Sequence, residues 1–151
     1  MINTIGYESA NLDDFIMSAS DAGIEILIDV RDRAQSRKKG FSKTALSEAL
    51  NSVGIEYLHL RELGDPKEGR EAARSGQWAK FHKIYGEVLN SEKAQSAMEL
   101  ITNLSKTKSV CLLCYERDHK TCHRKCITDE IERRVGEKAR HLGVRKYVSA
   151  A

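Results

Sequence analysis

The chain has 151 residues, of which 40% are hydrophobic and 31% charged, and its formal net charge is +3. This length and composition predict a single globular domain over residues 1–151, and no apolar run approaches the ~20 residues of a membrane-spanning helix. The small net charge is weak evidence for nucleic-acid binding, because domains that bind nucleic acid are usually strongly basic or have a clustered basic face, so local clustering is what matters.

Short apolar segments alternate with helical patterns along the chain. Strands are predicted at residues 4–7, 24–30, 55–60, 109–115 and 139–142. Helices are predicted from Asn11 to Gly23, from Ser42 to Gly54, two or three times within 67–104 with breaks near Gly76 and Asn90, and over 122–135. This alternation predicts an α/β fold, a three-layer sandwich in which a mostly parallel sheet of four or five strands is flanked by helices.

Polar residues follow the strand predicted at 24–30. Asp29 and Arg31 stand at its carboxyl end, and Ser36 and Arg37 follow in a basic loop before the helix that begins at Ser42. Ligands of parallel sheets bind beyond the carboxyl ends of strands, and two guanidiniums beside a helix N-terminus are typical of an anion site. The alternative is a solvated loop in which Asp29 and Arg31 pair with each other or with loop backbone.

A second group of reactive residues follows the strand predicted at 109–115. Cys114 and Glu116 lie at the strand end, and Cys122, His123 and Arg124 lie near the start of the last helix. A thiol near a helix N-terminus has a lowered pKa, so Cys114 or Cys122 could be a nucleophile with His123 as its base. The alternative is a pair of structural cysteines, since free cysteine is among the most buried residue types.

A metal site is a further possibility in this stretch, with Cys114, Cys122 and His123 as its ligands. The spacing does not follow the paired Cys-x2-4-Cys pattern of structural zinc sites, so an open catalytic site is favoured over a closed one. Cys126 belongs to a core-facing helical stripe and Cys111 lies within a strand, so packing explains both. No cofactor is required by the sequence.

The start of the chain has neither the basic n-region nor the long apolar stretch of a secretory signal, which favours the cytoplasm and argues against a membrane partner. In that reducing compartment we expect all four cysteines to be thiols. Weaker candidates for the same cleft are carboxylates after the third strand, Glu62 and Asp65, and a helical segment in which Trp78 stands near Arg74 and Lys80. Nothing in the sequence indicates the oligomeric state.

Several ordered motifs together resemble the domain-of-unknown-function 488 family. They are Thr4 to Glu8, Ile28 to Arg31 with Ser36-Arg37 and Gly40 to Lys43, Gly54-Ile55 with Tyr57 to Leu60, Leu63-Gly64, and Leu113 to Glu116 through Cys122 to Arg124. One departure is the stretch Asp32 to Gln35, where the family often has a proline. The resemblance implies that both groups form one site, of Asp29, Arg31, Ser36, Arg37, Cys114, Glu116, Cys122, His123 and Arg124, and it implies no reaction.

A looser resemblance is to rhodanese-like sulfurtransferases, whose Asp-Val-Arg strand is similar to Leu27 to Arg31 and whose catalytic cysteine also follows a strand, as Cys114 does. It implies that Cys114 would accept a sulfane sulfur in a loop of backbone amides. Tyr115 and Glu116, directly after Cys114, depart from the short loop of small residues in that family.

Three functions follow from these patterns. The first is an enzyme-like domain that binds a phosphate-bearing ligand, a nucleotide or nucleic acid, on Arg31, Arg37 and Arg124, with a thiol or acid at the reacting atom. The second is sulfur transfer or thiol redox chemistry through Cys114 and Cys122. The third is a non-catalytic nucleic-acid-binding module that uses the basic segment 31–43, whose binding would fall steeply with salt.

Overall fold

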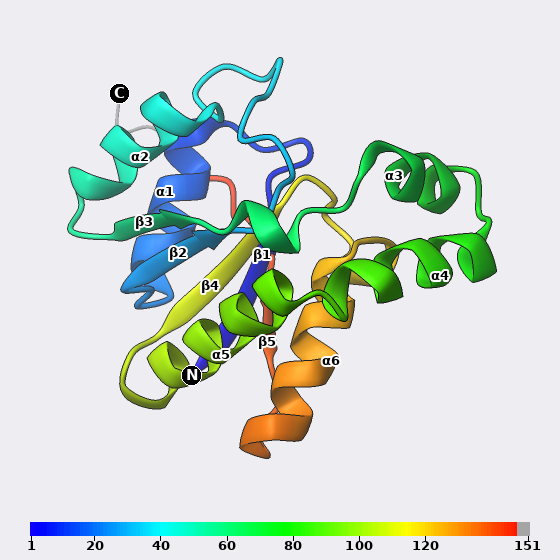
Figure 1. Ribbon diagram of the computed structural model, residues 1–151. Helices are drawn as coiled ribbons and strands as arrows, with labels where there is room; N and C mark the ends of the chain where they lie inside the picture. The colour runs from blue at the N-terminus through cyan, green and yellow to red at the C-terminus, as the bar shows by residue number, and fades with distance from the viewer. Residues whose placement is uncertain (148–151) are drawn as a thin grey trace.

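The computed structural model, which describes residues 1–147, has a five-stranded sheet at its centre (Figure 1). The strands are β1 (Ile2–Gly6), β2 (Ile26–Asp29), β3 (Glu56–His59), β4 (Val110–Cys114) and β5 (Arg140–Leu142), in the order β3-β2-β4-β1-β5. All four strand pairs are parallel. The predicted α/β sandwich is therefore confirmed, with five strands and a wholly parallel sheet among the described residues.

Within residues 1–147, six α-helices surround the sheet. They are α1 (Leu12–Asp21), α2 (Lys43–Asn51), α3 (Lys67–Arg74), α4 (Trp78–Leu89), α5 (Glu92–Thr107) and α6 (Arg124–Val135), with short 3-10 helices η1 (Arg61–Leu63) and η2 (His119–Thr121). Asn11 caps α1 as predicted, because its side-chain oxygen accepts a hydrogen bond from the Asp14 amide. The last helix begins at Arg124 rather than at Cys122, since η2 and an extended Cys122 precede it.

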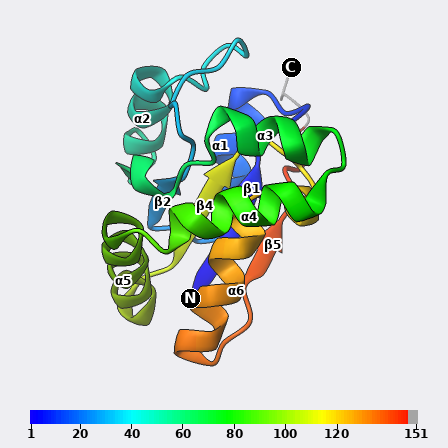
Figure 2. The ribbon, with the colours of Figure 1, turned by 45° about the vertical axis from the view of Figure 1, so that its right-hand side comes forward.

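The hydrophobic core lies on both faces of the sheet, because side chains alternate along each strand. From β2, Ile26 and Ile28 pack on the face that α4, α5 and α6 cover, whereas Leu27 packs on the face that α1 and α2 cover. Figure 2 shows α3 and α4 on the same side as α5 and α6. Burial on both faces explains why β2 and β4 have apolar runs rather than an alternating pattern.

The strand order brings segments that are distant in sequence to one edge of the sheet. β4 lies between β1 and β2, with Cys114 in register with Gly6 and Leu113 in register with Asp29. The strand order therefore switches at β4, which is where open parallel sheets bind ligands. No helix among residues 1–147 is both long and apolar enough to cross a bilayer.

Candidate functional site

A cavity of about 590 Å³ lies beyond the carboxyl ends of β2 and β4. Its walls come from the loop after β2, from Asp65 and α3, and from the segment between β4 and α6. Seven of the nine residues predicted for the site line it: Arg31, Ser36, Arg37, Cys114, Glu116, Cys122 and His123. The other two, Asp29 and Arg124, are buried next to these segments. The fold thus brings together the two groups that the sequence placed about 80 residues apart.

Asp29 and Arg31 form a buried ion pair at the end of β2. Arg31 donates from Nε and Nη2 to the two carboxylate oxygens of Asp29, at 2.9 and 2.7 Å. Its Nη1 donates to the Phe41 carbonyl at 2.7 Å and to the Tyr7 hydroxyl at 3.2 Å. Burial disfavours the charged guanidinium, but the hydrogen bonds and charge of Asp29 outweigh burial and raise the pKa of Arg31. The pair holds the basic loop to the strand end.

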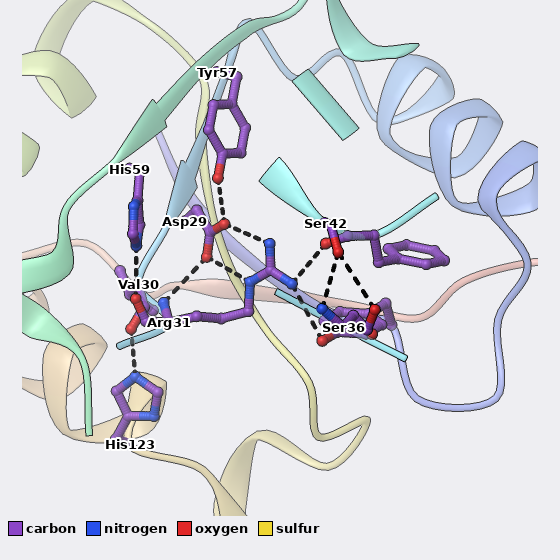
Figure 3. A network of polar contacts seen from close by, with 10 residues as sticks. Asp29, Val30, Arg31, Ser36, Ser42, Tyr57, His59 and His123 are labelled. Carbon is purple, nitrogen blue, oxygen red and sulfur yellow. Dashed lines mark hydrogen bonds and ion pairs between the residues drawn. The ribbon is translucent and has the colours of Figure 1, made fainter. Parts of the chain in front are cut away.

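Hydrogen bonds fix the loop that follows (Figure 3). The Ser42 hydroxyl accepts from the Ser36 amide at 3.1 Å and donates to the Ser36 carbonyl, while the Ser36 hydroxyl accepts from the Lys38 amide. Ser42 therefore closes this loop instead of capping its own helix, α2. These bonds order a loop that lacks the family's proline. Ser36 shapes the loop, and Arg37 and Lys38 extend from it to the cavity wall.

Two histidines hold the backbone at the end of β2. His59 Nε2 lies 2.8 Å from the Arg31 carbonyl, and His123 Nε2 lies 2.8 Å from the Val30 carbonyl. Figure 3 shows both histidines beside the end of β2. A carbonyl only accepts, so each Nε2 carries the proton. Burial lowers the pKa of His123 to about 4, so its ring is neutral and Nδ1 has a free lone pair. That Nδ1 lies 3.5 Å from Cys122 Sγ.

Cys114 and Cys122 meet at the cavity, and the structure joins them in a disulfide. The prediction that all four cysteines are thiols is therefore wrong for this pair, because η2 turns the chain back and places Cys122 against the end of β4. Cys111 and Cys126 are free, and Cys111 is in the core as predicted. Cys126 is half-buried and packs against the core.

Two carboxyl groups at the cavity, those of Asp65 and Glu116, have raised pKa values. Burial raises the pKa of Asp65 to about 7, and the charges of Glu116 and Asp32 add to this effect while Arg70 opposes it. Oδ1 of Asp65 is buried without a hydrogen-bond partner among the described residues. Burial also raises the pKa of Glu116. Both groups therefore hold a proton at a higher pH than ordinary carboxyls do, as acid–base groups in active sites do.

Arg124 is the largest fully buried side chain among the described residues, with 1% of its surface exposed. Its Nη2 donates to the Arg117 carbonyl at 2.9 Å, whereas Nε and Nη1 have no partner within residues 1–147. Burial lowers the pKa of Arg124 to about 10, although the charges of Cys111, Glu116 and Asp118 oppose this change. The guanidinium therefore remains charged at neutral pH and lies beneath the Glu116 segment.

Four cations line the cavity and take part in none of the ion pairs found within residues 1–147. Arg33, Arg37 and Lys38 come from the loop after β2, and Arg74 comes from the end of α3. Arg70 also lines the cavity, 3.6 Å from Asp32. These four cations are therefore outside the ion pairs of the described residues, although the charge of Arg74 acts on Glu116.

Several residues at the site were not singled out by the sequence. Tyr7 and Tyr57 donate or accept hydrogen bonds at the Asp29–Arg31 pair, and Arg70 lines the cavity. Tyr7 and Tyr57 belong to motifs shared with the resembled family, and those motifs were the only sequence feature that pointed to them. Of the weaker candidates, Asp65 and Arg74 line the cavity, whereas Glu62, Trp78 and Lys80 are not part of its wall.

A family model described as "Domain of unknown function DUF488" matches residues 11–131 of the chain. The chain belongs to this family. The matched part of the DUF488 domain contains both groups of site residues and all of α3, so it contains nearly the whole cavity wall. Comparison with curated proteins and with solved structures gives no match. The family's description specifies no reaction, and the site itself is the guide to function.

Proposed function

We propose that the DUF488 domain is an enzyme-like domain that binds a phosphate-bearing ligand, a nucleotide or nucleic acid, in this cavity. The observation that supports it is the set of cations without ion-pair partners among the described residues, Arg33, Arg37, Lys38 and Arg74. Arginine binds phosphate through two parallel hydrogen bonds, and a cation that the protein leaves unpaired is available to do so. The cavity volume of about 590 Å³ is also in the range of small-molecule sites.

The acids at the cavity strengthen this proposal rather than oppose it. Asp65 and Glu116 would repel a phosphate if both were ionised. Because burial raises the pKa of Asp65 to about 7, this carboxyl is partly protonated at neutral pH and the cavity carries less negative charge than its composition suggests. A carboxyl that titrates near neutral pH is also suited to general acid or base catalysis on the bound ligand.

In this proposal the site residues have different roles. Arg37, Lys38 and Arg74 contact the phosphate, while Arg31 lines the cavity floor and Asp29 keeps it in place. Cys114, Cys122, Glu116 and Asp65 are the groups at the reacting atom, with His123 beside Cys122. Arg124 acts from below the cavity wall as a fixed positive charge.

Calorimetry with a nucleoside triphosphate and with a short single-stranded oligonucleotide tests the proposal. Arg37→Ala should weaken binding of at least one of them by about tenfold or more, because a charge-assisted hydrogen bond contributes about 1.5–3 kcal/mol. Lys93→Ala is the matched control, since it removes one exposed positive charge from α5, away from the cavity. If neither ligand binds, or if both variants bind like the wild type, the cavity is not a phosphate site.

A second candidate function is thiol redox chemistry or sulfur transfer, which the Cys114–Cys122 disulfide favours. An external thiolate would attack one sulfur of the pair, forming a mixed disulfide and releasing the other cysteine as a thiolate. His123 Nδ1, neutral and 3.5 Å from Cys122 Sγ, can accept a hydrogen bond from the thiol of a reduced Cys122. After reduction, alkylation by iodoacetamide should have a pH midpoint below the ordinary thiol range. Slow alkylation with an ordinary midpoint at both residues would rule this chemistry out.

A further inference from the structure

The ligand atoms of Cys114, Glu116 and Cys122 lie within 4.8 Å of one another, close enough for a single metal ion to contact all three. Cys114 is the last residue of β4, Glu116 follows two residues later, and Cys122 lies between η2 and α6. The two sulfurs are buried and the carboxylate is half-buried, and all three residues line the cavity. An ion bound by these three residues would thus be held by the protein on one side and would face the cavity on the other.

The backbone spacing of the two cysteines suits a bridging ion. Their Cα atoms are 7.5 Å apart, whereas disulfide-bonded cysteines usually have Cα atoms about 4.4–6.8 Å apart. A tetrahedral zinc ion with Zn–S bonds of about 2.3 Å keeps its two sulfurs about 3.8 Å apart, and so allows a wider backbone spacing than a disulfide does. Reduction of the pair by an external thiol or phosphine supplies the two thiols that such a site needs.

The surrounding charges also favour an anionic metal centre. Two thiolates and one carboxylate around a divalent ion carry a net charge of −1. Buried Arg124 lies near Glu116 and has two guanidinium nitrogens without partners among the described residues. A buried cation is costly without a compensating negative charge, and a centre with a charge of −1 would provide one.

We propose that the reduced DUF488 domain binds one zinc ion through the sulfurs of Cys114 and Cys122 and the carboxylate of Glu116, with a fourth position open to the cavity. Two thiolates select zinc over magnesium and calcium, which prefer oxygen ligands. Three protein ligands and one open position are the arrangement of catalytic zinc sites. His123 is not among the three, because no ring nitrogen of His123 belongs to the group of ligand atoms that all lie within 4.8 Å of one another, although its Nδ1 lies 3.5 Å from Cys122 Sγ.

The proton and electron balance of this site is simple. Two electrons and two protons convert the disulfide to two thiols, and zinc binding then releases both thiol protons. Zinc and the disulfide therefore exclude each other. The inference does not rest on the proposed phosphate function, because its ligands are not the cations that would contact a phosphate.

Zinc titration of the full chain tests the proposal, with a chromophoric chelator as competitor after reduction by a phosphine. One zinc ion per chain should bind to the reduced wild type and none to the oxidised form. Cys114→Ser and Cys122→Ser should each weaken binding by at least about a hundredfold, and Glu116→Gln by about tenfold or more. Cys126→Ser, which alters a cysteine outside the cavity, should bind like the wild type.

Two further measurements separate loss of the site from loss of the fold. Cobalt should replace zinc and give thiolate-to-metal absorption in the wild type and in Glu116→Gln, and X-ray absorption at the zinc edge should detect two sulfur ligands. Circular dichroism shows whether each variant is folded. Absence of zinc binding by the reduced wild type, a zinc ion with fewer than two sulfur ligands, or equal affinity in Glu116→Gln would overturn the proposal. Arg37→Ala should leave zinc affinity unchanged, because Arg37 is not a zinc ligand. Failure of the phosphate proposal can therefore be told apart from failure of the zinc proposal.

Discussion

Asp65 and Asp29 are both buried aspartates at the carboxyl edge of the sheet, yet their surroundings differ. Both oxygens of Asp29 are hydrogen-bonded, by Arg31 and Tyr57, whereas Oδ1 of Asp65 has no partner among the described residues. An unpaired buried carboxyl favours its neutral form, because burial penalises the charge. Asp29 is therefore suited to supporting the site, and Asp65 to exchanging a proton within it.

The raised pKa of Asp65 predicts a pH dependence of ligand binding. As the pH rises through about 7, Asp65 loses its proton and the cavity gains a negative charge. Affinity for an oligonucleotide, whose phosphodiesters do not titrate in this range, should therefore fall by up to about tenfold between about pH 6 and pH 8. Calorimetry at both pH values measures the change.

Asp65→Asn should remove most of this pH dependence, and Glu62→Gln should not. Glu62 is the matched control because it is exposed on η1 and outside the cavity wall. A dependence that survives in Asp65→Asn would assign it to another group. The same shift also affects folding: since the folded state binds this proton more tightly than the unfolded chain, the contribution of Asp65 to stability falls as the pH rises from 3.8 towards about 7.

The contact between β1 and the segment after β4 depends on the absence of a side chain at Gly6. A Cβ atom there would lie 1.8 Å from the Glu116 carbonyl oxygen and 2.8 Å from Arg124 Nη1. Since the first of these is a backbone atom, an alanine would have to push the whole segment away from the strand. The position of Glu116, and with it the spacing to Cys122, therefore depends on a glycine at the end of another strand.

Gly6→Ala should lower the free energy of unfolding by about 1–3 kcal/mol, because it overpacks a buried contact. Gly86→Ala is an informative control, since a Cβ atom at that position in α4 meets nothing within 4 Å. Alanine there should leave stability unchanged or raise it by up to about 1 kcal/mol, as a helix interior favours it. Urea unfolding of both variants measures the two effects. Equal stability of Gly6→Ala and the wild type would show that the segment moves without cost.

The sequence predicts the elements of this fold well, but it does not predict which side chains meet. Apolar runs identify β2 and β4, and the caps and glycines bound the helices, because these signals are local. Tyr57 reaches Asp29 only because β3 pairs with β2, and Cys122 reaches Cys114 only because η2 reverses the chain. Of the cavity wall that α3 forms, the sequence indicated only Arg74 and missed Arg70, because this wall depends on how a helix folds over the sheet, which no local pattern specifies.

The charge of the whole molecule is nearly balanced, so binding of a polyanion would depend on the cations gathered at the cavity. If the four cations without ion-pair partners among residues 1–147 each replace a counterion on an oligonucleotide, the slope of log affinity against log salt concentration should be about −3. Arg37→Ala should reduce the slope by about 1. Fluorescence anisotropy at several salt concentrations gives the slope. A slope near zero would show that these cations do not bind phosphates.

Replacing both Cys114 and Cys122 distinguishes residues that bind the nucleic acid from residues that take part in a reaction. A doubly substituted Cys114→Ser, Cys122→Ser chain that keeps its affinity and salt slope assigns nucleic-acid binding to the basic loop and α3 alone. If turnover of a bound nucleotide occurs in the wild type and is lost in this variant, the thiols take part in the reaction.

The place of β4 in the sheet has a consequence for how the chain folds. β1 and β2 are synthesised before β4, but they do not pair with each other, because β4 fills the position between them. Until residues 110–114 leave the ribosome, both strands have an unpaired edge, and closure joins residues about 100 positions apart. Such non-local pairing is slow and exposes strand edges to aggregation. Completion of the sheet therefore depends on β4, and the cavity forms in the same step.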